Sequence, residues 1–333
     1  MLEHGGRLHF YSHLYRRPVD DWLDLSTGIN PTGWPVADLP ASVWSRLPDK
    51  DDGLTTAAQT YYQTSNILPV AGSQAAIQLL PALRSACSVG IIAPAYAEHR
   101  FCWQQAGHRV LSLDSSEIQQ RLPELDVLII VNPNNPTGEL IPASQLLQWH
   151  AHLSQRGGWL IVDEAFIDVS PANSLASHSA LPNLIILRSL GKFFGLAGLR
   201  VGFVLAATQL LEQIEQTLGP WPIATASRYL ATRALQDTDW QQQISNTLQQ
   251  ASLRLDALLR DYQLAPSGGT ALYKWIKTTD AAKLHDALAR RGVLTRLFEN
   301  PPSLRFGLPG TEQAWAQLDA TLAAVKEELH RVS

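Results

Sequence analysis

The stretch Leu184–Ala206, which reads LIILRSLGKFFGLAGLRVGFVLA, decides the fold. It contains two short apolar runs, Leu184–Leu187 and Val201–Ala206, separated by a loop that is rich in glycine and phenylalanine. Short runs of Ile, Val and Leu bounded by turn residues are typical of strands that are buried on both faces of a sheet. The stretch therefore predicts two strands joined by a loop that carries one lysine, Lys192.

Similar apolar runs precede this stretch, and helical patterns lie between several of them. Further strands are expected at Ile67–Ala71, Val89–Ala93, Val127–Val131 and Trp159–Val162. Helices are expected at Gln74–Arg84, Ala143–Gln155 and Thr208–Thr217. Strands that alternate with helices favour an α/β fold in which helices cover both faces of a mostly parallel sheet.

The pattern changes after Pro222. Strands and helices then mix without regular alternation, which predicts a smaller α+β domain. We expect helices at Ala224–Leu235, Trp240–Asp261, Ala281–Arg291 and from Glu312 onward, with strands at Thr270–Ile276, Val293–Arg296 and Ser303–Phe306. The proline- and glycine-rich segment Ser26–Pro35 is expected to be irregular and to pass near the functional site. The predicted division is a large domain at 41–225 and a small domain made of 1–40 and 226–333.

Composition excludes several classes of function. Charged residues make up only 17% of the chain and the formal net charge is −4, which gives no support to nucleic-acid or anionic-membrane binding. Two cysteines cannot form a disulfide framework, and no apolar stretch reaches the roughly 18 residues of a membrane span. We therefore expect a cytoplasmic protein with a small-molecule partner and without a metal site.

Motifs whose side chains could bind a ligand or take part in a reaction follow several of the predicted strands. Open α/β sheets bind their ligands at this end of the strands. Ala71–Gln74 lies between a strand and a helix, so Ser73 and Gln74 are placed to hold a phosphate at a helix start. The alternative is an ordinary turn capped by Ser73. Asn132–Gly138, NPNNPTG, predicts a rigid loop in which Asn135 donates its amide to a phenolate oxygen, or else a purely structural loop.

Two further motifs supply a carboxylate and an amine. Asp163 ends a buried strand, and a buried carboxylate needs a cationic partner such as a protonated pyridine nitrogen; the alternative is that it caps the next element. Lys192 lies among glycine, phenylalanine and leucine, where desolvation favours the free amine that a Schiff-base lysine needs; the alternative is a solvated side chain. Ser189 and Arg200 flank Lys192 and suit a phosphate.

In this order and spacing, NPNNPTG (132–138), DEAF (163–166) and SLGKFFGLAGLR (189–200) make the chain similar to the class I/II aminotransferase superfamily, the fold-type I pyridoxal-phosphate (PLP) enzymes. The resemblance implies a homodimer that binds PLP covalently at Lys192, with Asp163 on the pyridine nitrogen as the second catalytic residue. It implies ring contacts from Asn135 and Tyr96. It also implies that the cofactor phosphate is held by Ser73, Gln74, Ser189 and Arg200, and that a substrate α-carboxylate is bound by Arg305.

The sequence departs from this superfamily at two positions. Phe166 follows Asp163-Glu164-Ala165 where the superfamily often has a tyrosine whose hydroxyl bonds the ring oxygen. Leu47 replaces a tyrosine that, in the histidinol-phosphate aminotransferase branch, reaches the cofactor phosphate of a neighbouring subunit. Neither tyrosine role is therefore carried over to this chain.

The N-terminal segment is the part that discriminates between activities. His4-Gly5-Gly6 and Leu23–Pro31, with Tyr96-Ala97-Glu98-His99, resemble the threonine-phosphate decarboxylases of cobalamin biosynthesis. This resemblance implies decarboxylation of L-threonine O-3-phosphate to (R)-1-aminopropan-2-yl phosphate and CO2. The residues expected to bind that substrate, apart from Arg305, are His4, Gly28, Asn30 and Arg296.

Two alternatives to the decarboxylase remain. The first is histidinol-phosphate aminotransferase or a related amino-acid aminotransferase, which shares the fold and the cofactor. The second is a protein of the PLP fold that serves as a binding or regulatory module. Loss of catalysis would not be expected to spare Lys192, Asp163, Asn135 and Arg200 together, so the sequence favours an enzyme.

Overall fold

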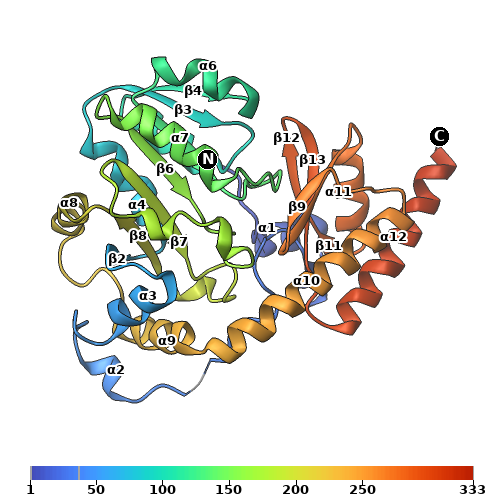
Figure 1. The fold of residues 1–333 in the computed structure, drawn as a ribbon. Coiled ribbons are helices and arrows are strands. Elements are labelled where there is room, and N and C mark those ends of the chain that lie inside the picture. Colours follow the sequence, from blue (N-terminus) through green and yellow to red (C-terminus); the bar gives the residue numbers. More distant parts are fainter. Residues whose placement is uncertain (1, 37, 333) are drawn as a thin grey trace. The chain divides into compact units, whose positions relative to one another are not determined.

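The computed structural model describes residues 2–36 and 38–332, with side chains as far as residue 328. The chain forms two compact units. The large unit consists of 33–135 and 140–243, and the small unit of the described residues up to 32, 136–139 and those from 244 onward (Figure 1). Each unit is therefore assembled from segments that are distant in the sequence.

A seven-stranded sheet forms the centre of the large unit, with strand order β2-β8-β7-β6-β5-β3-β4. Only β8 runs antiparallel to its neighbours, and the other described pairings are parallel. The strands are β2 (Ile67–Val70), β3 (Ser88–Ile92), β4 (Arg109–Leu113), β5 (Val127–Val131), β6 (Trp159–Asp163), β7 (Leu184–Ser189) and β8 (Gly202–Ala206).

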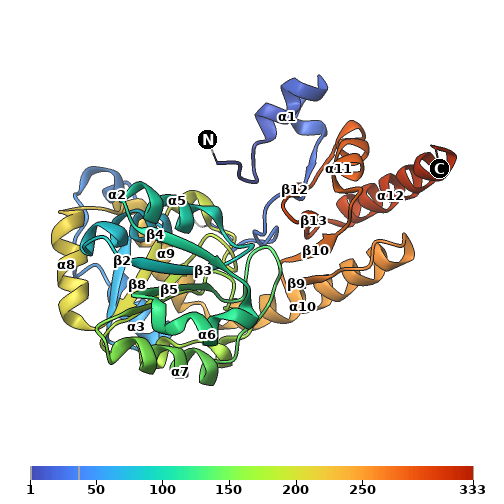
Figure 2. The same cartoon turned by 90° about the horizontal axis from the view of Figure 1, so that it is seen from above.

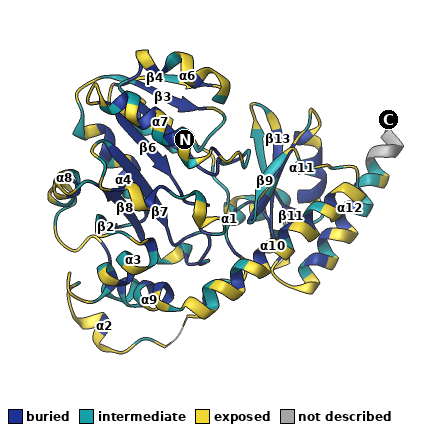
Figure 3. Ribbon diagram, in the orientation of Figure 1, coloured by how far each residue is buried: buried dark blue, intermediate teal, exposed yellow. Residues whose placement is uncertain are grey.

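Helices cover both faces of this sheet. One face is covered by α4 (Ser73–Leu79), α5 (Ala97–Gln105) and α8 (Thr208–Leu218), and the other by α3 (Leu54–Tyr62) and α7 (Ala143–Ser154) (Figure 2). Shorter or peripheral helices are α2 (Ser42–Ser45), α6 (Ile118–Arg121) and α9 (Thr225–Gln236). Every residue of β5, β6, β7 and β8 is buried, as Figure 3 shows by colour. Burial on both faces explains why these strands are largely apolar rather than alternating, with polar residues only at the ends of β6 and β7.

The strand directions bring the sequence motifs to one edge of the sheet. The carboxyl ends of β2, β5, β6 and β7 lie at the same edge because β2 and β7 are both antiparallel to β8. For the same reason β8 begins at that edge, directly after the loop that contains Lys192. The topology thus gathers all four motifs where a parallel sheet binds its ligand.

The small unit contains a four-stranded antiparallel sheet with the order β12-β13-β10-β9. Its strands are β9 (Gly268–Thr270), β10 (Tyr273–Lys277), β12 (Arg296–Glu299) and β13 (Pro302–Gly307), and a short parallel pair joins β1 (Leu23–Asp24) to β11 (Val293–Leu294). The helices are α1 (Leu8–Tyr15), α11 (Ala281–Arg290) and α12 (Glu312–Val332), while α10 (Thr238–Asp261) runs from one unit into the other.

The α/β class is confirmed, with its mostly parallel central sheet and a smaller unit that mixes helices and strands. The irregular character of Ser26–Pro35 is also confirmed. The prediction of a single strand at Thr270–Ile276 is wrong, because the chain turns after Thr270 and β9 pairs with β10 as a hairpin. Within the described residues, no helix is long and apolar enough to cross a membrane.

Candidate active site

The turn between β2 and α4 lies against the guanidinium of Arg200. Gly72 has a φ of +71°, and a Cβ on it would lie 2.5 Å from Arg200 Nη2. A Cβ on Gly202, at the start of β8, would lie 2.5 Å from the backbone nitrogen of Ser73. Glycine at both positions lets a cationic side chain and the first N–H groups of α4 approach each other, which is an arrangement suited to an anion.

Gln74 and Tyr96 are joined by a hydrogen bond within this region. The Tyr96 hydroxyl donates to Gln74 Oε1 at 3.2 Å, and Gln74 Nε2 donates to Glu98 Oε2 at 3.0 Å. Burial, together with the charges of Glu98 and Asp163, raises the pKa of Tyr96 to about 12, so its hydroxyl stays protonated at neutral pH. The Gln74 side chain therefore orients Tyr96, and the group of Gln74 suited to a phosphate is its backbone N–H.

Asp163, the last residue of β6, is almost completely buried. The backbone N–H of Ala165 donates to Asp163 Oδ1 at 3.1 Å, and His99 Nε2 lies 2.9 Å from Asp163 Oδ2. A carboxylate can only accept, so the imidazole N–H is the donor in the second contact. Asp163 thus faces the site as an oriented carboxylate, and His99 is a residue whose contact the sequence did not predict.

The loop after β5 is held by the side chains that flank Asn135. Asn132 donates to and accepts from the backbone of Ile141, and Asn134 Nδ2 donates to the carbonyl of Pro94 at 2.8 Å. The backbone N–H of Asn132 also donates to the carbonyl of Asp163. Asn135 itself is half-buried. The loop is irregular and held by several hydrogen bonds, and Asn135 lies three residues after the anchor of Asn132 on Asp163.

Lys192 is half-buried in the loop between β7 and β8. Its Nζ lies 5.3 Å from the centroid of the buried Phe166 ring, within the range of a cation–π contact. The other lysine of the large unit, Lys50, pairs with Glu215 at the surface. Ser189 Oγ accepts from the backbone N–H of Gly191 at 3.2 Å and so fixes the start of the same loop.

These contacts connect most of the predicted cofactor residues. Asp163 is linked through His99 to Tyr96 and from there to Gln74, because the Tyr96 and His99 ring centroids are 6.2 Å apart. Arg200 contacts the turn before Ser73 and acts electrostatically on Tyr96. Lys192 and Asn135 lie in the loops that follow β7 and β5, and Ser189 is the last residue of β7.

The donor set fits PLP. A buried carboxylate suits a protonated pyridine nitrogen, a half-buried amine beside an apolar ring suits a Schiff base, and a guanidinium against a glycine turn suits a phosphate. The space at Gly72 is the most specific of these observations, since any side chain there would meet Arg200 Nη2.

The predicted carboxylate-binding residue, Arg305, lies on β13 of the small unit and is buried. Its Nη2 donates to the carbonyl of Ser26 at 2.8 Å, and its guanidinium lies 5.0 Å from the Tyr273 ring centroid. Burial is the main cause that lowers the pKa of Arg305 to about 10, which still leaves the side chain cationic at neutral pH. A buried guanidinium of this kind needs an anionic partner.

Arg296 lies directly opposite Arg305 in the β12–β13 pairing. Residues paired in this way project from the same face of a sheet, with Cβ atoms about 5 Å apart. Arg296 Nη2 donates to the backbone carbonyl of Glu3 at 2.7 Å, and Nη1 lies 3.4 Å from Glu3 Oε2. Two cations on one face normally repel each other, so this face is suited to a ligand with two anionic groups.

The other predicted substrate residues belong to the same unit. His4 is half-buried next to Glu3, while Gly28 and Asn30 are buried in the irregular segment that follows β1. Asn30 Oδ1 accepts from the backbone N–H of Thr32 at 2.8 Å, which shapes that segment. The N-terminal segment is fixed to it because Ser26 Oγ accepts from the N–H of Gly6 at 2.8 Å. Among the residues that the structure describes, no group of three or more His, Cys, Asp or Glu side chains could hold a metal.

Comparison with known proteins gives consistent matches. The chain matches the family described as aminotransferase class I and II over residues 44–318. It is 52% identical to a threonine-phosphate decarboxylase from Pseudomonas aeruginosa over 99% of this chain and 100% of the relative. It is 40% identical to a threonine-phosphate decarboxylase from a Sinorhizobium species over 92% of this chain and 93% of the relative.

Among solved structures, it resembles a histidinol-phosphate aminotransferase from Sinorhizobium meliloti in complex with pyridoxal-5'-phosphate. The TM-score is 0.84 and the identity 19%, over 96% of this chain and 95% of that chain. At this identity the likeness concerns the fold alone.

Proposed function

The chain belongs to the aminotransferase class I and II family, and from this premise we propose that it is a PLP-dependent carboxy-lyase. The proposed reaction converts L-threonine O-3-phosphate and a proton into (R)-1-aminopropan-2-yl phosphate and CO2, as in cobalamin biosynthesis. The relatives at 52% and 40% identity support this activity over an aminotransferase.

The observation that carries the proposal is the cross-strand pair of Arg296 and Arg305. Threonine phosphate has two anionic groups, a carboxylate and a phosphate, and two arginines on one face of a sheet match two anions. The pair therefore suits the amino acid phosphate, with Arg305 on the carboxylate and Arg296, helped by His4, Gly28 and Asn30, on the phosphate. The relatives at 52% and 40% identity favour this substrate over the substrates of an aminotransferase.

In the large unit we assign the cofactor to the residues at the edge of the sheet. Lys192 binds it covalently, Asp163 keeps its pyridine nitrogen protonated, and Asn135 donates to its ring oxygen. Tyr96 packs on the ring face, and the phosphate is held by Ser73, Gln74, Ser189 and Arg200. When bound, PLP supplies the electron sink into which the electrons of the broken Cα bond pass.

The residues of the chain then decide which bond breaks. With PLP bound, the choice of bond would depend on how the residues of the chain orient the substrate at the cofactor. One anchor on the carboxylate would leave the substrate free to rotate about its Cα–N bond. A second anchor, Arg296 on the phosphate, removes that freedom and uses remote binding energy to present the Cα–carboxylate bond.

A proton must replace the departing CO2 at Cα. Lys192 Nζ would be suited to deliver it, because its side chain is half-buried and Nζ lies 5.3 Å from the centroid of the Phe166 ring. The orientation of the Asp163 carboxylate is fixed during this step because both of its oxygens accept hydrogen bonds.

A product assay tests the proposal. Purified protein loaded with PLP is incubated with phosphothreonine in the presence and absence of 2-oxoglutarate. We expect CO2 and aminopropanol phosphate in equal amounts, with no dependence on the oxo-acid. Glutamate formation from histidinol phosphate and 2-oxoglutarate, without CO2 from phosphothreonine, would identify an aminotransferase instead.

We also propose that the enzyme is a homodimer. Four large apolar side chains of the large unit are more than half exposed, namely Val36, Trp44, Leu47 and Trp221. Exposed apolar groups of this size mark interaction surfaces when they gather in one patch. Light scattering should give twice the 36.7 kDa of the chain, and Trp44→Lys should lower that mass. A monomer at micromolar concentration would contradict the proposal.

A further inference from the structure

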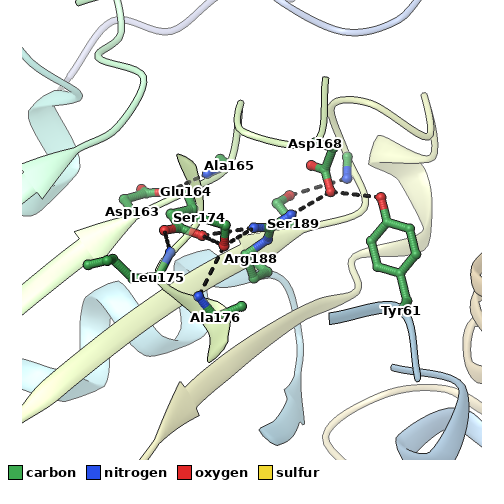
Figure 4. Close-up of polar contacts among 11 residues, drawn as sticks. Tyr61, Asp163, Glu164, Ala165, Asp168, Ser174, Leu175, Ala176, Arg188 and Ser189 are labelled. Atoms are coloured by element: carbon green, nitrogen blue, oxygen red, sulfur yellow. Dashed lines mark hydrogen bonds and ion pairs between the residues drawn. The ribbon is translucent and has the colours of Figure 1, made fainter. Parts of the chain in front are cut away.

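A cluster of buried charges lies behind the candidate cofactor residues, on the opposite face of the sheet. Successive side chains of a strand point to opposite faces, so Arg188 projects away from the side that Ser189 faces. Arg188 and its two carboxylate partners, Glu164 and Asp168, have side chains that are at most 3% exposed (Figure 4). Glu164 directly follows Asp163, so each strand end carries a site residue and a cluster residue side by side.

The guanidinium of Arg188 spans a five-residue turn. Its Nη1 donates to Glu164 Oε2 at 2.8 Å, and its Nη2 donates to Asp168 Oδ1 at 2.6 Å. Both ends of the turn 164–168 are thus bound to one rigid group on the neighbouring strand. The N–H of Leu175 also donates to Glu164, and the Tyr61 hydroxyl donates to Asp168 Oδ1 at 3.0 Å (Figure 4).

The second and third residues of this turn, Ala165 and Phe166, contact two of the candidate catalytic residues. The N–H of Ala165 donates to Asp163 Oδ1, and the Phe166 ring lies 5.3 Å from Lys192 Nζ. A displacement of the turn would therefore move the Asp163 carboxylate and the ring beside Lys192 together.

The far end of the turn is also tied to the lysine loop. Tyr61, which bonds Asp168, packs edge-on against Phe194 with ring centroids 5.5 Å apart. Phe194 lies two residues after Lys192 in the loop between β7 and β8. The cluster thus contacts supports of the lysine loop as well as those of Asp163.

Stability alone does not explain a cluster of this composition. Two carboxylates face one guanidinium, while Asp168 Oδ2 and Arg188 Nε are buried without a hydrogen-bond partner among the described residues. Incompletely satisfied buried polar groups cost stability, and apolar residues of similar volume often stabilise a core as well or better. Such departures from optimal packing concentrate at functional sites.

We propose that Arg188 is a positioning residue of the active site. Its planar fork fixes the turn 164–168 and thereby holds the Asp163 carboxylate and the Phe166 ring at the places where they act on the cofactor and on Lys192. A point charge would not do the same, because an ammonium cannot hold two carboxylates in a planar, fixed geometry. The inference rests on the proposed cofactor roles of Asp163 and Lys192.

Arg188→Lys removes the planar guanidinium but keeps the positive charge, so it tests whether the guanidinium geometry is needed. Arg228→Lys is the matched control. Arg228 makes a two-bond ion pair with Asp52 in the same unit, at 2.6 and 2.7 Å, and its side chain is 8% exposed. Both variants lose a buried arginine pair, but only Arg188 contacts the turn behind Asp163.

The first readout needs no cofactor. Hydrogen exchange in peptides that cover 164–176 should be at least about tenfold faster in Arg188→Lys, and unchanged there in Arg228→Lys. In the PLP-loaded protein, the pH midpoint of the visible absorbance should move by about half a unit or more in Arg188→Lys only. Its kcat should fall about tenfold with little change in KM, because a misplaced catalytic group affects the reacting state.

Equal exchange rates and equal absorbance midpoints in the two variants would overturn the inference. If Arg188→Lys does not fold, Tyr61→Phe decides, since it removes one bond to Asp168 and keeps the ring on Phe194. A midpoint identical to that of the unmodified protein would then refute the positioning role. Failure of the proposed function is distinguishable, because the unmodified protein would then show no visible absorbance with PLP or release no CO2.

Discussion

His99 shows how a single residue supports the chemistry of another. It shares a buried hydrogen bond of 2.9 Å with Asp163, and the two residues are 64 positions apart in the chain. The imidazole N–H donates to a carboxylate oxygen, so His99 fixes the orientation of the carboxylate that is proposed to face the pyridine nitrogen. Its effect on catalysis should therefore exceed its effect on folding.

Replacement of His99 by phenylalanine tests this difference. We expect His99→Phe to lower the free energy of unfolding by about 1–3 kcal/mol, since a buried acceptor loses its donor, and to reduce kcat about tenfold or more. The control is His150→Phe on α7, which removes another buried imidazole, whose Nε2 lies 2.8 Å from the carbonyl of Pro182. Equal activity in the two variants would show that His99 has only a structural role.

Phe166 gives a prediction for the pH dependence of the bound cofactor. A tyrosine hydroxyl at this position would donate to the ring oxygen of PLP, and a donor to the anionic oxygen favours the deprotonated form. Phe166→Tyr should therefore lower the pKa that is read from the visible absorbance, so the transition moves to lower pH. Phe101→Tyr on the exposed part of α5 is the control and should leave the transition in place. A transition at higher pH would contradict the expected hydrogen bond.

At the scale of an element, the turn from β2 into α4 depends on the absence of a side chain. Gly72→Ala should cost about 1–3 kcal/mol, because alanine is strained at a φ of +71°, and its Cβ would also displace Arg200. Gly157→Ala is a control for the strain alone, since that glycine has a φ of +69° with no atom within 4 Å of its Cβ position. PLP affinity, measured by fluorescence titration, should fall only for Gly72→Ala.

The pairing of β12 with β13 makes a prediction about substrate selection. Arg296→Ala should raise the KM for phosphothreonine about tenfold or more, which corresponds to about 1.4 kcal/mol, and leave the weak reaction of threonine unchanged. Arg7→Ala is the matched control, because Arg7 Nη1 also approaches Glu3, at 3.6 Å, but lies outside the strand pair. An equal loss of activity toward threonine and phosphothreonine would show that Arg296 contributes only to the stability of the protein.

A strand whose bounds the sequence predicted correctly is one whose burial is complete. β5 was expected at Val127–Val131 and begins and ends there, because a strand buried on both faces is apolar at every position. β4 was missed because it is a partly exposed edge strand, and α5 because only His99 and Trp103 are buried on it. The turn of the β9–β10 hairpin was missed because Ala271-Leu272 has none of the residues that favour a two-residue turn.

The residues of the candidate site also differ in how far the sequence could predict them. Residues within one motif, such as Lys192 or Asp163, were predictable because their surroundings in the sequence already suggest their chemistry. Glu98, His99 and the Arg188 cluster were not, because their partners lie 20 to 64 residues away and a single hydrogen bond leaves no periodic signal. Pairings of that kind arise only when the sheet order brings strand ends together.

At the scale of the whole molecule, the predicted fold-type I architecture is confirmed by the match to the family over residues 44–318 and by the solved aminotransferase. The proposed roles are divided between the two units. The proposed cofactor residues all belong to the large unit, and the proposed substrate residues all belong to the small unit. Each unit is built around its own sheet.

The chain leaves the large unit at Asn135 and enters a small-unit segment at Pro136. That segment packs closely against β9. A Cβ on Gly138 would collide with the backbone of Gly269, and a Cβ on Gly268 would collide with the backbone of Thr137. The proposed donor to the cofactor's ring oxygen is thus one peptide bond from a part of the small unit. A substitution in the segment 136–139 therefore borders directly on Asn135, although the segment belongs to the small unit.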